Sequence, residues 1–146
     1  MSRNPMRTLV ELARVHEETS LKRLVGLLAD CRTQKDQLAL LEHYRLDYQQ
    51  RLTANGKRGI APIELDNFRR FMAQLDLAVA KQGGTLARAE DRSAQGKLNW
   101  HAALRELRSY EALLERREVA ARVLQAGRAQ ASDDEAAARQ SGALRR

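Results

Sequence analysis

The sequence predicts an all-α protein built as a long antiparallel two-helix coiled coil, a hairpin rod. Only two prolines occur among its 146 residues, so long helices can run without interruption. Charged residues make up 31% of the chain and aromatic residues 4%, which is typical of long helices and not of a compact core with many large side chains. Turn-forming residues are concentrated in one segment, where the hairpin would turn.

The first helix is expected over about residues 4–53. Asn4 followed by Pro5 is typical of an N-cap and a first-turn proline. No further proline occurs before Thr53, and Gly26 is the only glycine. Before Leu24 the apolar residues fall on more than one face. From Leu24 onward, steps that alternate between three and four residues place the following side chains on one face: Leu24, Leu27, Cys31, Gln34, Leu38, Leu41, Arg45, Tyr48 and Leu52.

The hairpin tip is expected over residues 54–62. This segment holds Asn55-Gly56, Gly59 and Pro62, the densest cluster of turn formers in the chain. Pro62 suits the first turn of a second helix, and Glu64 follows where negative charge favours a helix N-terminus.

The second helix, expected over about residues 63–131, has the strongest periodicity. The alternation of three and four predicts a coiled-coil seam. The seam consists of Leu65, Phe68, Met72, Leu75, Val79, Gln82, Leu86, Ala89, Ser93, Gly96, Trp100, Ala103, Leu107, Tyr110, Leu114, Arg117, Ala121 and Leu124. Gly83-Gly84 costs about 2 kcal/mol relative to alanines. A flexible or slightly bent stretch is the favoured interpretation, and a functional hinge is the alternative.

A short turn places the two helices side by side and antiparallel. Tyr48 should then face Phe68 to Met72, and Leu9 should face Leu107 to Tyr110. Helix 1 should run out opposite about residue 113. The rest of helix 2 is expected to overhang, and its apolar residues Leu114, Val119, Val123 and Leu124 should lack a partner within the chain. The whole chain is expected to form one domain, with a frayed tail over 132–146.

The charge and the reactive residues argue against several function classes. The net charge of +7 is spread thinly, without a block of five or six like charges, so a solvated helix surface explains it as well as a nucleic acid does. No apolar run is long enough for a membrane span. Cys31 stands alone, which favours a reducing cytoplasm. The three histidines are scattered. His16 and His101 are expected to lie close, where a polar contact is favoured over a metal site. Neither a catalytic motif nor a cofactor is predicted.

The aromatic residues indicate a binding surface. Four of the six, Tyr44, Tyr48, Phe68 and Phe71, lie near the predicted tip. Phe71 flanks the seam and should be partly exposed. An aromatic cluster wider than a two-stranded seam requires is a reasonable protein-binding hot spot, with core packing as the alternative.

These same segments resemble the flagellar FliJ family of the bacterial type III export apparatus. The likeness covers nearly the whole chain and is sharpest over Leu41 to Tyr48, Asn55 to Ala61 and Asn67 to Leu75. The Tyr-x-x-x-Tyr pair, the Gly-Ile-Ala tip and the Phe-x-x-Phe-x-x-x-Leu run occur together in this order.

The resemblance implies a stalk-like coiled coil that is not an enzyme. It implies binding to the hexameric flagellar export ATPase, to the cytoplasmic domain of the export gate and to export substrate chaperones. It also implies a cytoplasmic location, peripheral to the inner membrane at the flagellar base. The implied gate-binding stripe comprises Gln37, Leu41, Tyr44, Tyr48, Phe71, Leu75, Ala78 and Gln82. The overhang resembles the part that enters the ATPase ring, through Leu114, Arg117, Val119, Val123 and Leu124.

Two other functions stay open at this point. The equivalent stalk protein of a virulence secretion system has the same architecture. A basic coiled-coil nucleic-acid-binding protein belongs to a different class, and the lack of a contiguous basic helix segment argues against it.

Overall fold

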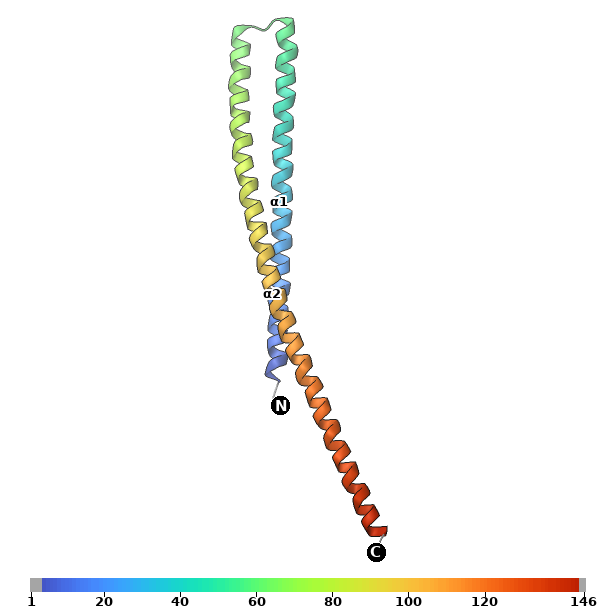
Figure 1. Cartoon of the computed structure of the whole chain (residues 1–146). Coiled ribbons are helices and arrows are strands. Elements are labelled where there is room, and N and C mark those ends of the chain that lie inside the picture. The colour runs from blue at the N-terminus through green and yellow to red at the C-terminus, as the bar shows by residue number, and fades with distance from the viewer. Residues whose placement is uncertain (1–3, 145–146) are drawn as a thin grey trace. The chain divides into compact units, whose positions relative to one another are not determined.

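A computed structural model describes residues 4–144, which form two long α-helices that pack against each other. Helix α1 spans Pro5–Arg58 and helix α2 spans Pro62–Leu144, with a loop at residues 59–61 (Figure 1). No helix within the described range combines the length and hydrophobicity of a membrane span. The chain divides into two units, which are described separately. One is Glu18–His101, and the other joins the described residues up to Glu17 with those from Ala102 onward.

Both helices begin as the sequence predicts. The Asn4 side-chain Oδ1 accepts a hydrogen bond from the Met6 backbone N–H at 3.1 Å, and the Asn4 carbonyl accepts from Arg7 at 3.1 Å. Asn4 is therefore an N-cap, which satisfies N–H groups that lack an intrahelical partner. At the start of α2, the Ala61 carbonyl accepts from the Leu65 N–H at 3.0 Å, and Pro62 occupies the first helical position.

Helix α1 ends five residues later than the expected Thr53, so the expected tip at 54–62 shortens to residues 59–61. A single helical glycine costs only about 1 kcal/mol, and Gly56 therefore stays within the helix. Gly59 ends it, because its φ of 86° is left-handed and its N–H approaches the Gly56 carbonyl at 3.4 Å. Lys57 and Arg58 in the last turn complement the helix dipole.

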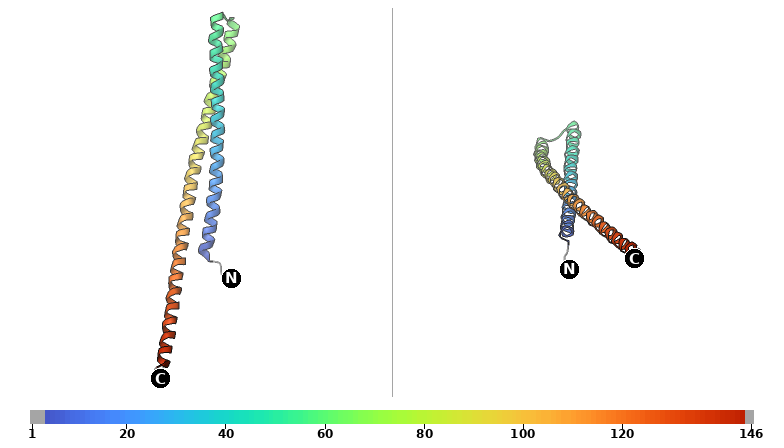
Figure 2. Two further views of the ribbon diagram at one scale, coloured as in Figure 1. Left: turned by 90° about the vertical axis from the view of Figure 1, so that its right-hand side faces the viewer. Right: turned by 60° about the horizontal axis from the view of Figure 1, so that its bottom comes forward.

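Helix α2 also extends past its expected end near residue 131 and is continuous to Leu144 (Figure 2). The predicted fray is wrong over residues 132–144, and residues 145–146 lie outside the described range. Alanine, glutamate, glutamine and arginine in this segment favour helix. Two local contacts add to this: Gln130 donates to Asp134 at 3.1 Å, and Arg139 lies 3.8 Å from Glu135.

In the unit Glu18–His101, the predicted seam is where the two helices meet. The α2 seam positions from Leu65 to Trp100 are all buried or half-buried. Contacts between the helices include Arg45–Asp76 at 2.8 Å and Asp30–Arg92 at 3.3 Å. A Cβ at Gly96 would lie 2.8 Å from the Leu27 Cδ1, so glycine at this position permits the close approach of the helices.

In the other unit, the start of α1 packs on α2, and the contact extends further along α2 than predicted. Val10, Ala13 and Leu107 form a buried cluster, and Tyr110 and Leu114 pack against it. Ion pairs join Arg7 to Glu118 at 2.9 Å and Arg14 to Glu111 at 3.8 Å, and the His16 Nδ1 lies 3.9 Å from a Glu106 oxygen. The predicted end of pairing near residue 113 is therefore wrong, and Leu114 has a partner within the chain.

At the start of α1 the predicted register holds, since Val10 packs with Leu107, but the side chain of Leu9 does not take part in the contact. Leu9 is 40% exposed, and Val10 and Ala13 face α2 instead. Continued backward from Leu24, the three-four alternation passes through two half-buried polar residues, Ser20 and Glu17. It then reaches three buried residues: Ala13, Val10 and Met6. The two polar positions concealed this stripe in the sequence.

Candidate functional site

An aromatic cluster lies beside the interhelical loop. The Tyr48 ring on α1 contacts two rings on α2, with centroid distances of 6.0 Å to Phe68 and 4.3 Å to Phe71. The Tyr48–Phe68 pair is edge-on, and these separations fall near the range of favourable aromatic pairs. The Arg51 guanidinium lies 5.8 Å from the Tyr48 ring centroid, within cation–π reach. Phe71 remains 38% exposed, so the cluster is wider than the seam needs.

The cluster borders a shallow hollow of about 380 Å³. Three aromatic rings line it together with two polar side chains: Tyr48, Phe68, Phe71, Glu64 and Asn67. Open aromatic surface with polar groups at its edge is the usual composition of a protein-binding hot spot. The sequence interpretation missed Glu64 and Asn67. Their place beside Phe71 could have been predicted from the sequence, because positions 64, 67 and 71 lie on one face of a helix.

In the structure, the residues of the gate-binding stripe implied by the family resemblance differ in their exposure. Gln37, Tyr44 and Phe71 are exposed, while Leu41, Tyr48, Ala78 and Gln82 are half-buried. Leu75 is only 8% exposed, because its side chain lies in the seam. Phe71, at 38% exposure, and Tyr44, at 49%, are therefore the large accessible side chains of this set. Tyr48 contacts the rings of both Phe68 and Phe71.

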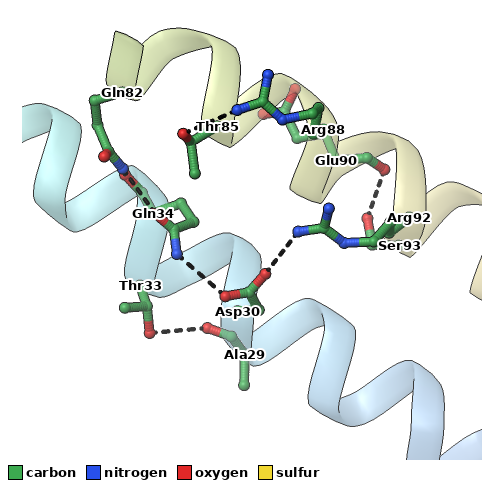
Figure 3. A network of polar contacts seen from close by, with 10 residues as sticks. All are labelled: Ala29, Asp30, Thr33, Gln34, Gln82, Thr85, Arg88, Glu90, Arg92 and Ser93. Atoms are coloured by element: carbon green, nitrogen blue, oxygen red, sulfur yellow. Dashed lines mark hydrogen bonds and ion pairs between the residues drawn. The ribbon is translucent and has the colours of Figure 1, made fainter. Parts of the chain in front are cut away.

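A polar layer interrupts the apolar seam further from the loop (Figure 3). The Gln82 side-chain N–H group donates to the Gln34 Oε1 at 2.8 Å and to the Gln34 backbone carbonyl at 3.1 Å. The Gln34 amide in turn donates to Asp30 at 3.2 Å, and Arg92 donates to the other Asp30 oxygen at 3.3 Å. Paired polar groups in a seam favour one register, since any shift would leave them unpaired.

Comparison with known protein families adds the deciding observation. The family model described as flagellar FliJ protein matches residues 1–145. The chain belongs to the flagellar FliJ protein family. It is therefore a component of the flagellar export apparatus. Comparisons with curated proteins and with solved structures give no match.

The residues expected to enter an ATPase ring lie on α2 of this FliJ-family chain. Leu114 is half-buried against the Val10 cluster and offers little free surface. Arg117 is exposed, and so are three apolar residues: Val119 at 44%, Val123 at 67% and Leu124 at 58%. A shallow hollow of about 400 Å³ lies at the start of this region. Its lining residues are Ala112, Glu115, Arg116, Val119 and Ala120.

Histidines and carboxylates do not assemble into a metal centre in the described part of the chain. Among residues 4–144, no group of three or more histidine, cysteine, aspartate or glutamate side chains could hold a metal ion. His16 lies 3.9 Å from a Glu106 oxygen, so a carboxylate stands where the sequence analysis expected His101.

Proposed function

We propose that this FliJ-family chain is a non-enzymatic, stalk-like antiparallel coiled coil of the flagellar export apparatus. It binds the hexameric export ATPase, couples that ring to the cytoplasmic domain of the export gate and escorts substrate chaperones. Its place is in the cytoplasm, peripheral to the inner membrane at the flagellar base.

The order of contacts supports the antiparallel coiled coil. In the unit Glu18–His101, successive positions toward the loop on α1 contact successive positions toward the loop on α2: Asp30 with Arg92, Gln34 with Gln82, and Tyr48 with Phe71 and Phe68. The buried positions of α2 follow the three-four alternation that knobs-into-holes packing requires.

The exposed aromatic cluster carries the gate-binding part of the proposal. Phe71 is partly exposed although apolar residues fill the seam beside it, and its ring contacts the Tyr48 ring in a tilted arrangement with a centroid distance of 4.3 Å, which restricts both rings. Rings that are already fixed lose little conformational entropy when a partner binds. Truncation of an aromatic hot-spot residue typically costs about 2 kcal/mol or more in binding free energy.

Exposed apolar and basic residues on α2 support ring binding. Val119, Val123 and Leu124 leave apolar surface uncovered, with Arg117 and Arg122 exposed among them. Apolar contacts flanked by arginines suit an acidic protein surface.

The test is calorimetric binding of the full chain to the isolated cytoplasmic domain of the gate. The double variant Tyr48→Ala, Phe71→Ala should weaken binding by about 30-fold or more, which corresponds to at least 2 kcal/mol. Leu77→Ala is the matched control, because Leu77 is a large apolar residue of α2 with 72% exposure outside the cluster. If the double variant keeps its helical circular dichroism and binds the gate like the unaltered chain, the cluster is not the gate-binding site.

A further inference from the structure

Residues on one side of the helix contact in the unit Glu18–His101 form two lines that run along the helices. Positions seven residues apart lie on one line along a pair of supercoiled helices. The line on α2 consists of Phe71, Ala78, Thr85 and Arg92. The line on α1 consists of Tyr44, Gln37, Asp30 and Arg23. The Arg92 guanidinium lies 3.3 Å from the Asp30 carboxylate, so the two lines run side by side, and we call this surface the flank face.

The flank face changes from aromatic to basic with distance from the loop. It begins at Phe71, the partly exposed ring of the aromatic cluster. Lys81 and Arg88 each follow a residue of the α2 line by three positions, which places both beside that line. The Arg88 guanidinium donates to the Thr85 hydroxyl at 3.2 Å, so its charged end lies at the line (Figure 3). At a rise of 1.5 Å per residue, Lys81 is about 15 Å and Arg88 about 26 Å from Phe71 along the helix.

The basic part of the flank face has more positive charge than its own carboxylates neutralise. Asp30 is the acidic residue of the two lines, and Arg92 is already paired with it. Within residues 4–144, neither Lys81 nor Arg88 nor Arg23 forms an ion pair. These three exposed cations are therefore available to a partner.

Other carboxylates of the unit do not compensate for this charge. Asp91 comes three residues after Arg88, but the Arg88 guanidinium bonds to Thr85 on its other side. Asp36 and Asp91 each lie two residues from the seam positions before and after them, and therefore on the backs of the two helices.

The opposite side of the helix contact shows no such excess. It is formed by residues that come directly after a seam position, whereas the lines of the flank face come directly before one. The exposed charged residues on that side include Lys35 and Glu42 on α1, and Glu90 and Lys97 on α2. Acidic and basic residues are mixed there, so the segregation of positive charge is a property of the flank face and not of the whole unit.

An acidic polypeptide segment fits both parts of the flank face. An apolar side chain of the segment can cover Phe71 while its carboxylates reach the cations, which is electrostatic complementarity beside an aromatic anchor. An extended segment advances about 3.3 Å per residue, so it reaches Lys81 after about five residues and Arg88 after about eight. A nucleic acid fits less well, because its phosphates recur along its whole length and would meet the Glu64 carboxylate, which lines the hollow beside Phe71.

We propose that the flank face binds an acidic polypeptide segment of the same partner that covers the aromatic cluster, with carboxylates of that segment paired to Lys81 and Arg88. The assignment of this segment to the export gate rests on the proposed function. The contact is sensitive to salt, because both cations are exposed. The aromatic cluster supplies most of the affinity, and the two cations fix the direction in which the segment lies along the helices.

Calorimetry of the full chain with the isolated cytoplasmic domain of the gate, at about 0.05 M and about 0.3 M salt, tests the pairing. The double variant Lys81→Glu, Arg88→Glu, which we call the flank variant, should raise the dissociation constant about tenfold or more at the lower salt concentration, because two attractive pairs become repulsive. The effect should shrink at the higher concentration. The matched control is Lys35→Glu, Lys97→Glu, which makes changes of the same sign on the opposite side of the unit and should bind within about threefold of the unaltered chain. Both variants should keep the helical circular dichroism of the unaltered chain.

Zero-length cross-linking locates the paired carboxylates. A carbodiimide joins a lysine amine to a carboxylate that touches it, with loss of water. Mass spectrometry of the cross-linked complex should therefore find Lys81 joined to an aspartate or glutamate of the gate domain, and Lys97 without such a link. Lys81→Arg keeps the charge and should keep the affinity while this cross-link disappears.

The outcomes separate this inference from the proposed function. If the flank variant and the control variant bind the gate domain equally well, the inference is overturned and gate binding stands. If the unaltered chain does not bind the gate domain at all, the gate part of the proposed function is wrong, and this inference falls with it. A single-stranded DNA of about 20 nucleotides that binds more tightly than the gate domain, and that the flank variant releases, would assign the cations to a nucleic acid and also overturn the inference.

Discussion

Alanine at the paired glycines of α2, Gly83 and Gly84, should stabilise the protein, whereas alanine at a third glycine of the same helix should not. A Cβ at Gly83 would meet nothing within 4 Å, and one at Gly84 would meet only the Arg88 guanidinium at 3.5 Å. Each alanine therefore adds helix propensity without a clash, worth about 1 kcal/mol per residue. The double variant Gly83→Ala, Gly84→Ala should gain about 2 kcal/mol in the free energy of unfolding.

Gly96→Ala is the matched control, because it makes the same chemical change in the same helix. Its Cβ would lie 2.8 Å from the Leu27 Cδ1 and 3.6 Å from the Leu24 Cδ1. Overpacking of this kind costs about 1–3 kcal/mol, which cancels or exceeds the gain in propensity of about 1 kcal/mol. We therefore expect Gly96→Ala to leave the free energy of unfolding unchanged or to lower it by up to about 2 kcal/mol.

Urea unfolding followed by circular dichroism at 222 nm measures both effects. A gain of about 2 kcal/mol also raises the melting temperature by about 4–8 °C for a chain of this length. The reasoning is refuted if Gly96→Ala stabilises the protein as much as Gly83→Ala does. It is equally refuted if the double variant at 83 and 84 loses stability, because the backbone would then need glycine at those positions for another reason.

Three further predictions concern the contacts between the helices. Gln82→Ala should lower the free energy of unfolding by about 1–3 kcal/mol in urea unfolding, because it leaves Gln34 without its partner in the seam, and Gln82→Glu should not restore it. A double-mutant cycle on Arg45 and Asp76 should give a coupling energy below about 1 kcal/mol that disappears in 1 M salt, since both side chains are about half exposed; a larger, salt-independent coupling would contradict this. Leu107→Ala should cost about 2–5 kcal/mol in thermal unfolding, because it opens a cavity in the cluster with Val10, and a cost below 1 kcal/mol would show that the cluster is not packed as described.

The periodicity of α2 predicted its packing well because that helix keeps apolar or small residues at nearly every seam position. Each predicted seam position from Leu65 to Leu114 is buried or half-buried. The start of α1 was harder to predict. Its stripe passes through Ser20 and Glu17, and polar residues at two successive seam positions break the apolar pattern on which a sequence interpretation depends. The sequence interpretation consequently assigned Leu9 to the contact in place of Val10 and ended the pairing too early.

Helix ends depended on conformations that the sequence does not specify. Gly56 and Gly59 are equally good turn formers by composition, yet only Gly59 adopts a positive φ and stops α1. The aromatic cluster was predictable in part, because the spacing of Tyr48, Phe68 and Phe71 around a turn places them together. The burial of Leu75, which removes it from the predicted binding surface, was predictable as well, because the three-four alternation had already placed this residue in the seam.

The two exposed surfaces differ in the affinity that they can support. Phe71 at 38% and Tyr44 at 49% exposure present parts of large aromatic side chains, and the Phe71 ring already lies against the Tyr48 ring at 4.3 Å, so a partner gains apolar contact from few side chains. The exposed part of α2 that holds Val119, Val123 and Leu124 offers smaller aliphatic side chains, and ion pairs at such an exposed surface contribute less than about 1 kcal/mol each. A surface of that kind forms contacts that exchange readily. We therefore expect the aromatic cluster to hold its partner more durably than the exposed part of α2 holds its own.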